Sequence, residues 1–136
     1  MKEKLNQSTA HPQPMQMKQY IANEYVFEPS KAEIAYFMDS LNEILNGFPV
    51  KNFEGQVGAP AERVKQLWEK LNAAFRASLK DGESRKVGLS NAEMAILCQA
   101  SRLCIEALGQ SEFSSRLGES IPFAVKLVDT RRSFLG

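Results

Sequence analysis

Two cysteines and one histidine are the residues whose types could support redox, metal or nucleophilic chemistry. Cys98 and Cys104 are six positions apart, and side chains so spaced on a helix point about 120° away from each other, so they cannot form a disulfide within it. A zinc site needs a closer pair, such as Cys-x-x-Cys, with further ligands. The single histidine, His11, lies between polar residues and a proline. We predict that both cysteines are reduced core residues and that His11 is solvated.

The carboxylates have simpler explanations than acid–base catalysis. Glu33 and Glu93 follow Ser30 and Ser90 at the spacing of a helix capping box. The sequence contains no P-loop, dinucleotide fingerprint, nucleophile elbow or HExxH motif. We therefore expect no catalytic, metal-binding or cofactor-binding residue and no cofactor, and a small helical enzyme or redox protein is the last of the alternatives below. Three further carboxylates are expected on solvated helix faces: Asp39, Glu43 and Glu106.

The two capping boxes belong to a longer pattern that recurs in the sequence. "SKAEIA" begins at Ser30 and "SNAEMA" at Ser90, sixty residues later. A shift of sixty also aligns the apolar residues of the two following helices and an element Phe-x-x-x-(Val/Leu)-Gly, with one break, where Leu41 meets Ser101. Two amphipathic helices can share such a pattern by convergence, but caps, register and spacing agree here. We predict that residues 30–75 superpose on residues 90–135.

Each repeat unit is then a long helix, a short turn and a second helix. The second helices are expected to begin near Pro60 and near Ser120, with Gly82 ending the first of them. Short connections make such helices antiparallel neighbours. The predicted fold class is all-α: a small helical bundle built from two related helix–turn–helix hairpins, offset by 60 residues, with an N-terminal extension. The helical domain spans residues 30–136 and the N-terminal arm residues 1–29.

The arm divides into two parts. Residues 1–14 are polar and include two prolines, which predicts a flexible segment, whereas residues 15–28 carry several aromatic and aliphatic side chains. This second part is either a short helix or an extended segment that packs on the bundle. Its aromatic residues are of the type that anchors interfaces, so we predict a partner-binding role for Tyr20, Tyr25 and Phe27. The alternative is that they cover the bundle's own core, or that of a second copy in a swapped homodimer.

The charge argues against a nucleic-acid ligand without excluding it. "FEGQVGAPAERVKQLW" and "FSSRLGESIPFAVKLV" both have the outline of a helix-turn-helix motif. However, the net charge is only +1, and Glu62 and Glu119 occupy positions that would face phosphates. A helix-turn-helix DNA-binding regulator is therefore the first alternative for the function, and we predict no specific DNA binding at physiological salt.

A binding role toward another protein is what these observations favour. The chain has an ordinary globular composition, with 43% hydrophobic and 24% charged residues, and no secretory signal or transmembrane segment. We expect a cytoplasmic, non-enzymatic protein-binding module, such as an inhibitor, an immunity protein or an adaptor, whose partner is another protein and not a membrane.

Overall fold

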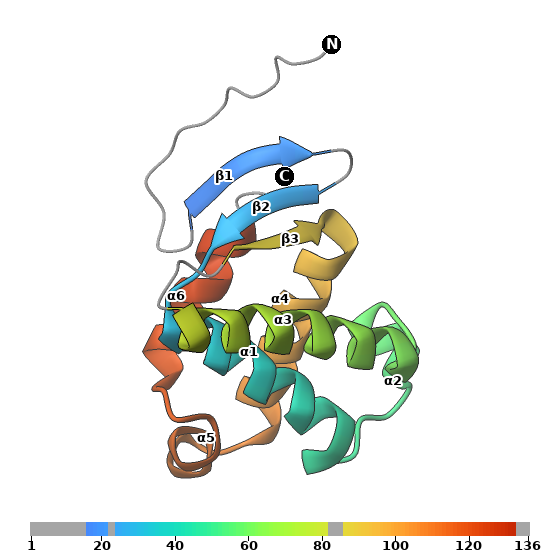
Figure 1. Ribbon diagram of the computed structural model, residues 1–136. Coiled ribbons are helices and arrows are strands. Elements are labelled where there is room, and N and C mark those ends of the chain that lie inside the picture. The colour runs from blue at the N-terminus through green and yellow to red at the C-terminus, as the bar shows by residue number, and fades with distance from the viewer. Residues whose placement is uncertain (1–15, 22–23, 82–85, 133–136) are drawn as a thin grey trace.

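The protein is mostly helical, as the sequence predicts. The computed structural model describes residues 16–21, 24–81 and 86–132, and the side chains of residues 26–77 and 86–129. Figure 1 shows a small sheet at one end of the helices and α5 at the other. In chain order, the elements are β1 (Gln16–Ile21), β2 (Glu24–Glu28), α1 (Lys31–Asn42), the π-helix η2 (Glu43–Gly47), α2 (Phe53–Val57), α3 (Ala61–Asp81), β3 (Val87–Ser90), α4 (Asn91–Ala107), α5 (Gln110–Leu117) and α6 (Ile121–Arg132).

Both predicted capping boxes are present. The Ser30 hydroxyl accepts the Glu33 N–H at 3.1 Å, and the Ser30 N–H donates to the Glu33 carboxylate at 2.7 Å. Ser90 and Glu93 form the same two bonds at 3.1 and 2.9 Å. These bonds satisfy backbone donors that would otherwise lack partners, so they define where α1 and α4 begin.

The helices of the two sequence units begin at matching positions. α1 and α4 begin at residues 31 and 91, and α3 and α6 begin at residues 61 and 121. Gly58 and Gly118 end α2 and α5 with φ of +91° and +72°. This left-handed conformation suits glycine, because other residues pay a steric cost there.

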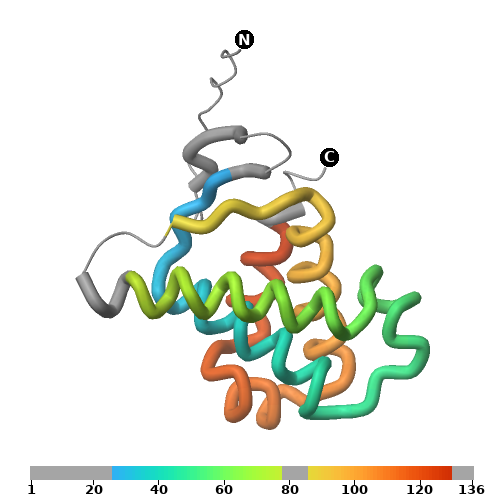
Figure 2. Tube along the Cα trace, turned by 45° about the vertical axis from the view of Figure 1, so that its right-hand side comes forward, coloured from blue at the N-terminus to red at the C-terminus, as the bar shows by residue number. Residues whose placement is uncertain are grey.

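The central helices α1 and α4 pack against each other and form the middle of the core. α3 packs on α1, and α6 packs on α4; Figure 2 shows α3 lying across the molecule beside α1. The short helices cross between the units, since α2 contacts α4 and α5 contacts α1. The core is therefore shared by both units. Its largest fully buried side chains are Tyr36, Phe27, Phe37, Phe113, Ile34, Leu41, Leu67, Leu71, Leu89 and Met94.

The antiparallel sheet corrects the all-α prediction. β2 lies between β1 and β3, and the β2–β3 register joins Glu24 with Ser90 and Phe27 with Val87. Residues 15–28 are thus extended where the structure describes them. Each half of the molecule, residues 24–81 and residues 86–132, begins with a strand that leads directly toward a capped helix.

The edge of β3 that faces away from β2 is covered by α3. Lys70 Nζ donates to the Gly88 carbonyl at 2.8 Å and to the Glu93 carboxylate at 2.9 Å. One side chain of the first half therefore satisfies a strand carbonyl and the cap of α4 in the second half, and it blocks further strand pairing at that residue.

Candidate functional site

A buried polar cluster joins the two central helices. The hydroxyl groups of Tyr36 and Ser101 hydrogen-bond to each other, and Ser40 donates its hydroxyl to the Tyr36 carbonyl at 2.9 Å. The Cys104 thiol donates to the Ser40 carbonyl at 3.7 Å. Burial raises the pKa of Tyr36 to about 12. The cluster's polar groups are satisfied by one another inside the core, so it stabilises the α1–α4 contact rather than offering a reactive site.

The cysteines lie where the sequence predicts. Cys98 and Cys104 are both buried and form no disulfide. Burial raises the pKa of the Cys104 thiol to about 12, and the Glu43 carboxylate contributes to the same shift. Because the thiolate is the nucleophile, a thiol with so high a pKa is inert at neutral pH.

Glu43 corrects the prediction that it is solvated. Only 9% of the residue is exposed, and its carboxylate binds Arg116 of α5 with an Oε1–Nη2 distance of 2.7 Å. The same guanidinium donates to the Gly47 carbonyl at 3.0 Å. A Cβ on Gly47 would lie 1.9 Å from Glu43 Oε1, so the glycine leaves room for the carboxylate. Arg116 thus holds both ends of η2.

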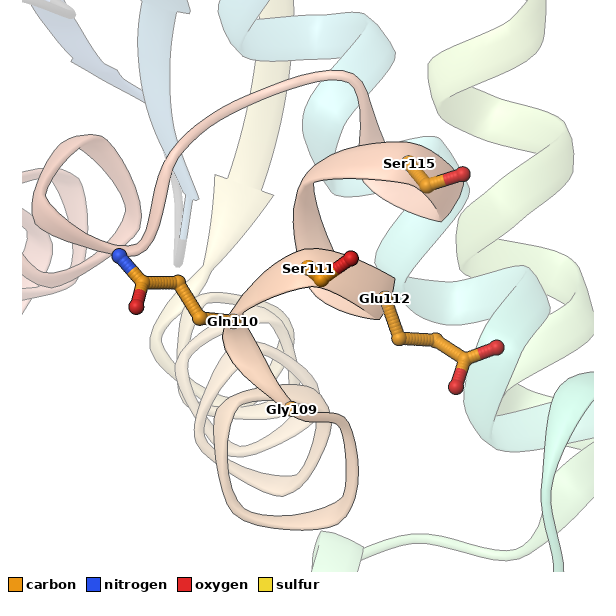
Figure 3. Close-up of a pocket in the computed structure, with 5 residues that line it drawn as sticks. All are labelled: Gly109, Gln110, Ser111, Glu112 and Ser115. Carbon is orange, nitrogen blue, oxygen red and sulfur yellow. The ribbon is translucent and has the colours of Figure 1, made fainter.

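The α5 pocket, of about 470 Å³, is polar and open. Its lining comes from one short helix and the glycine before it, and in Figure 3 the side chains of Gln110 and Glu112 point away from each other. Chemistry or tight binding requires groups that converge from several elements. We therefore assign no function to the pocket formed by Gly109, Gln110, Ser111, Glu112 and Ser115.

The α1–α3 pocket, of about 300 Å³, lies between the end of α1 with η2 and the middle of α3. Its partly buried apolar side chains are Leu45 and Trp68. On one wall, Asn46 donates its amide to the Asn42 side chain at 3.0 Å. The complete lining is Asn42, Leu45, Asn46, Lys65, Trp68 and Glu69.

The α4–α6 pocket, of about 190 Å³, lies between the second half of α4 and α6. On one wall, Arg102 donates to the Glu106 carboxylate at 2.9 Å. Val125 on the opposite wall is 44% exposed and is the exposed large hydrophobic residue among the side chains that the structure describes. The complete lining is Arg102, Ile105, Glu106, Val125, Val128 and Asp129.

The two pockets correspond residue by residue. Each of the six lining positions of the α1–α3 pocket, moved by sixty, gives a lining position of the α4–α6 pocket. In both pockets, two side chains four residues apart on one wall bind each other: Asn42 with Asn46, and Arg102 with Glu106. In both, the wall from α3 or α6 carries an exposed carboxylate, Glu69 or Asp129, that forms no hydrogen bond or ion pair with the described residues.

The residues predicted to bind a partner lie in the sheet. Tyr20 of β1 is opposite Tyr25 of β2, which is also opposite Leu89 of β3, but the side chains of both tyrosines are outside the described set. Phe27 is 0% exposed and packs in the protein's own core. Phe27 therefore contributes to the protein's own core, and a role of Tyr20, Tyr25 and Phe27 toward a partner stays a prediction. His11 lies outside the described residues.

Sequence reasoning missed the two pockets as a pair. Trp68 is partly buried against the core and Val128 is buried, and the sequence does not show which of their neighbours remain exposed. The sixty-residue register is the sequence signal that relates the two pockets, because a shift of sixty converts one lining into the other.

The described part of the chain has neither a candidate metal site nor a candidate membrane-spanning helix. It contains no group of three or more His, Cys, Asp or Glu side chains placed to hold a metal ion. Within the same part, no helix combines the length and the apolar character that crossing a membrane requires. No protein-family model, no curated protein and no solved structure matches this chain.

Proposed function

We propose that the protein is a non-enzymatic module that binds another protein through its two corresponding surface pockets. The observation that carries this proposal is the correspondence of all six lining positions, with apolar side chains beside polar ones in both pockets. Such a mixture of apolar surface and a few polar groups is typical of recognition sites. Cys104 and Tyr36, whose side chains could be reactive, are instead buried, which supports binding over catalysis. An inhibitor, an immunity protein and an adaptor all fit this description.

Site-specific photo-crosslinking in the source organism tests the proposal. A photoreactive phenylalanine analogue at Val125 and, separately, at Lys65 should form a crosslink to one defined protein. The same analogue at exposed Gln110 in the α5 pocket is the matched control and should not. Crosslinks from Gln110 alone, or equal patterns from all three positions, would contradict the proposal.

We also propose that the two halves are structural repeats built from related helix–turn–helix hairpins. The matching helix starts, the two capping boxes and the two left-handed glycines support this. The β2–β3 register adds a geometric argument, because Phe27 pairs with Val87, its own counterpart at sixty residues. An experimental structure in which Phe53 and Phe113 occupied unrelated environments would refute the repeat; Phe53 is partly buried and Phe113 fully buried here.

DNA binding is the second candidate function, and one observation favours it. Gly58 and Gly118 connect α2 to α3 and α5 to α6 through tight left-handed turns, as a helix-turn-helix motif requires. Against it, Arg116 is already held by Glu43, and the chain has a net charge of only +1. Retention on heparin at low salt, followed by a duplex complex that survives 150 mM salt, would favour DNA binding over protein binding.

A further inference from the structure

The two pockets share their geometry but differ in charge. The α1–α3 pocket contains one cation, Lys65, and one carboxylate, Glu69, whereas the α4–α6 pocket contains the cation of Arg102 and the two carboxylates of Glu106 and Asp129. The net charges of the linings are therefore zero and −1. Arg102 and Glu106 replace Asn42 and Asn46, and their charges cancel. The net difference therefore comes from Val125, which replaces Lys65 and removes a cation.

The extra negative charge resides on Asp129. Arg102 is already committed to Glu106, with both carboxylate oxygens 2.9 Å from Nη1. Asp129 forms no ion pair with Arg102, nor with the neighbouring Lys126 of its own helix. A solvated carboxylate that pairs with none of the described side chains can accept a cation from a ligand at little cost, since no such bond must be broken.

The apolar part of the same pocket lies beside this carboxylate. Val125 is 44% exposed, Ile105 is partly buried and Val128 is almost buried, so the pocket offers an apolar surface that ends at a negative rim. A lysine or arginine next to a large apolar residue matches both features at once.

We infer that the α4–α6 pocket docks a segment of a partner protein that presents a large apolar side chain beside a lysine or arginine. The inference rests on the proposed function and specifies the chemistry of the partner. By the same argument, the α1–α3 pocket accepts a similar apolar side chain but has no preference for an adjacent cation, because Lys65 compensates Glu69.

A small probe tests this chemistry without knowledge of the partner. Phenethylguanidinium carries a phenyl ring and a cation, and 2-phenylethanol is its neutral counterpart. Titrated into the ¹⁵N-labelled full chain, phenethylguanidinium should shift the amide signals of Val125, Val128 and Asp129 and bind there more tightly than the alcohol. Asp129→Asn should weaken its binding about two- to fivefold, the range of one exposed ion pair, and Asp129→Glu should retain it.

The other pocket supplies a gain-of-function control. Lys65→Val gives the α1–α3 pocket the charge of the α4–α6 pocket, so phenethylguanidinium should then bind around Trp68 and Glu69 with increased affinity, while binding of 2-phenylethanol should not change. Equal binding of both probes to the α4–α6 pocket, no effect of Asp129→Asn, or no shift near Val125 would each overturn the inference. Crosslinking from Val125 can succeed in all three cases, so failure here is distinguishable from failure of the protein-binding proposal.

Discussion

The two halves of the molecule differ in chemistry where they touch each other. Along the central helices, Leu41 of the first half corresponds to Ser101 of the second, and Tyr36 corresponds to Ile96. Tyr36 and Ser101 are the polar residues in these two comparisons, and their hydroxyl groups hydrogen-bond to each other. A polar residue that interrupts one apolar face is thus satisfied by a polar residue on the other.

The ion pair between η2 and α5 is a second polar contact that joins the two halves. Glu43 corresponds to Leu103, and Arg116 corresponds to Gln56. One side of the contact between the halves therefore has a carboxylate and a guanidinium 2.7 Å apart, while the other has an aliphatic side chain and an amide. Each half therefore satisfies its buried polar groups with polar groups supplied by the other half.

The strand pair at the start of the two halves should show the largest effect. Phe27 and Val87 are opposite each other and both buried, but they differ in size. Phe27→Ala should lower the free energy of unfolding by about 3–5 kcal/mol, and Val87→Ala by about 1.5 kcal/mol, the value of two buried methyl-sized groups. Urea unfolding measures both. Equal and small losses would mean that β2 does not belong to the folded core.

Alkaline pH should lower the stability of the protein through the buried Tyr36 and Cys104 between the central helices. The pKa values of Tyr36 and Cys104 are about 12 in the folded state, against ordinary values of 10.0 and 9.0. The folded state therefore holds these protons more tightly, and the stabilisation is complete below pH 9 and lost as the pH rises toward 12. The loss should be on the order of 2–4 kcal/mol for each group.

Urea midpoints between pH 8 and 11.5 measure this loss. Cys104→Val replaces the thiol with an apolar group, as at the corresponding Ile44, and should reduce the slope of stability against pH by the thiol's share. Lysine titration is common to both proteins and cancels in the difference. An unchanged slope would show that the thiol is not the group responsible.

The ion pair should behave as a unit. Arg116→Gln leaves the Glu43 carboxylate, only 12% exposed, without its guanidinium and should cost about 1–3 kcal/mol. Glu43→Leu combined with Arg116→Gln transfers the Leu103–Gln56 chemistry of the other side and should recover most of that loss. A double variant that is as unstable as the sum of the single variants would contradict coupling across the contact.

The smallest effect is expected for the two hydroxyl groups. Tyr36→Phe leaves the Ser101 hydroxyl buried without this bond and should cost about 1–2 kcal/mol. Tyr36→Phe with Ser101→Ala should cost less than the two single changes added together. Strict additivity in this double-mutant cycle would show that the short contact does not contribute to stability.

The helices could be predicted from the sequence because their signals are local. Ser30 and Glu33, like Ser90 and Glu93, are three residues apart, and the apolar faces repeat within one helix. The burial of Cys98 and Cys104 followed from their position on such a face. The starts of α3 and α6, one residue after Pro60 and Ser120, were predicted for the same reason.

The sheet and the polar contacts could not be predicted because their signals are distant. β3 is only four residues long, includes Gly88 and lies in a segment that resembles a linker; its paired residues in β2 are sixty or more positions away. Likewise, Ser101 was only a break in an apolar pattern until Tyr36, 65 positions earlier, was placed beside it. The pockets require knowledge of which helices pack side by side, which the periodicity of a single helix does not contain.

The pairing of Phe27 with Val87 also sets an order of events during synthesis. Residue 87 is added sixty peptide bonds after residue 27, and at about 5–20 residues per second this takes roughly 3–12 s. Throughout that interval β2 lacks the pairing with β3, and α1 lacks α4. The first half of the chain can form its capped helix early, but its core closes only when the second half arrives.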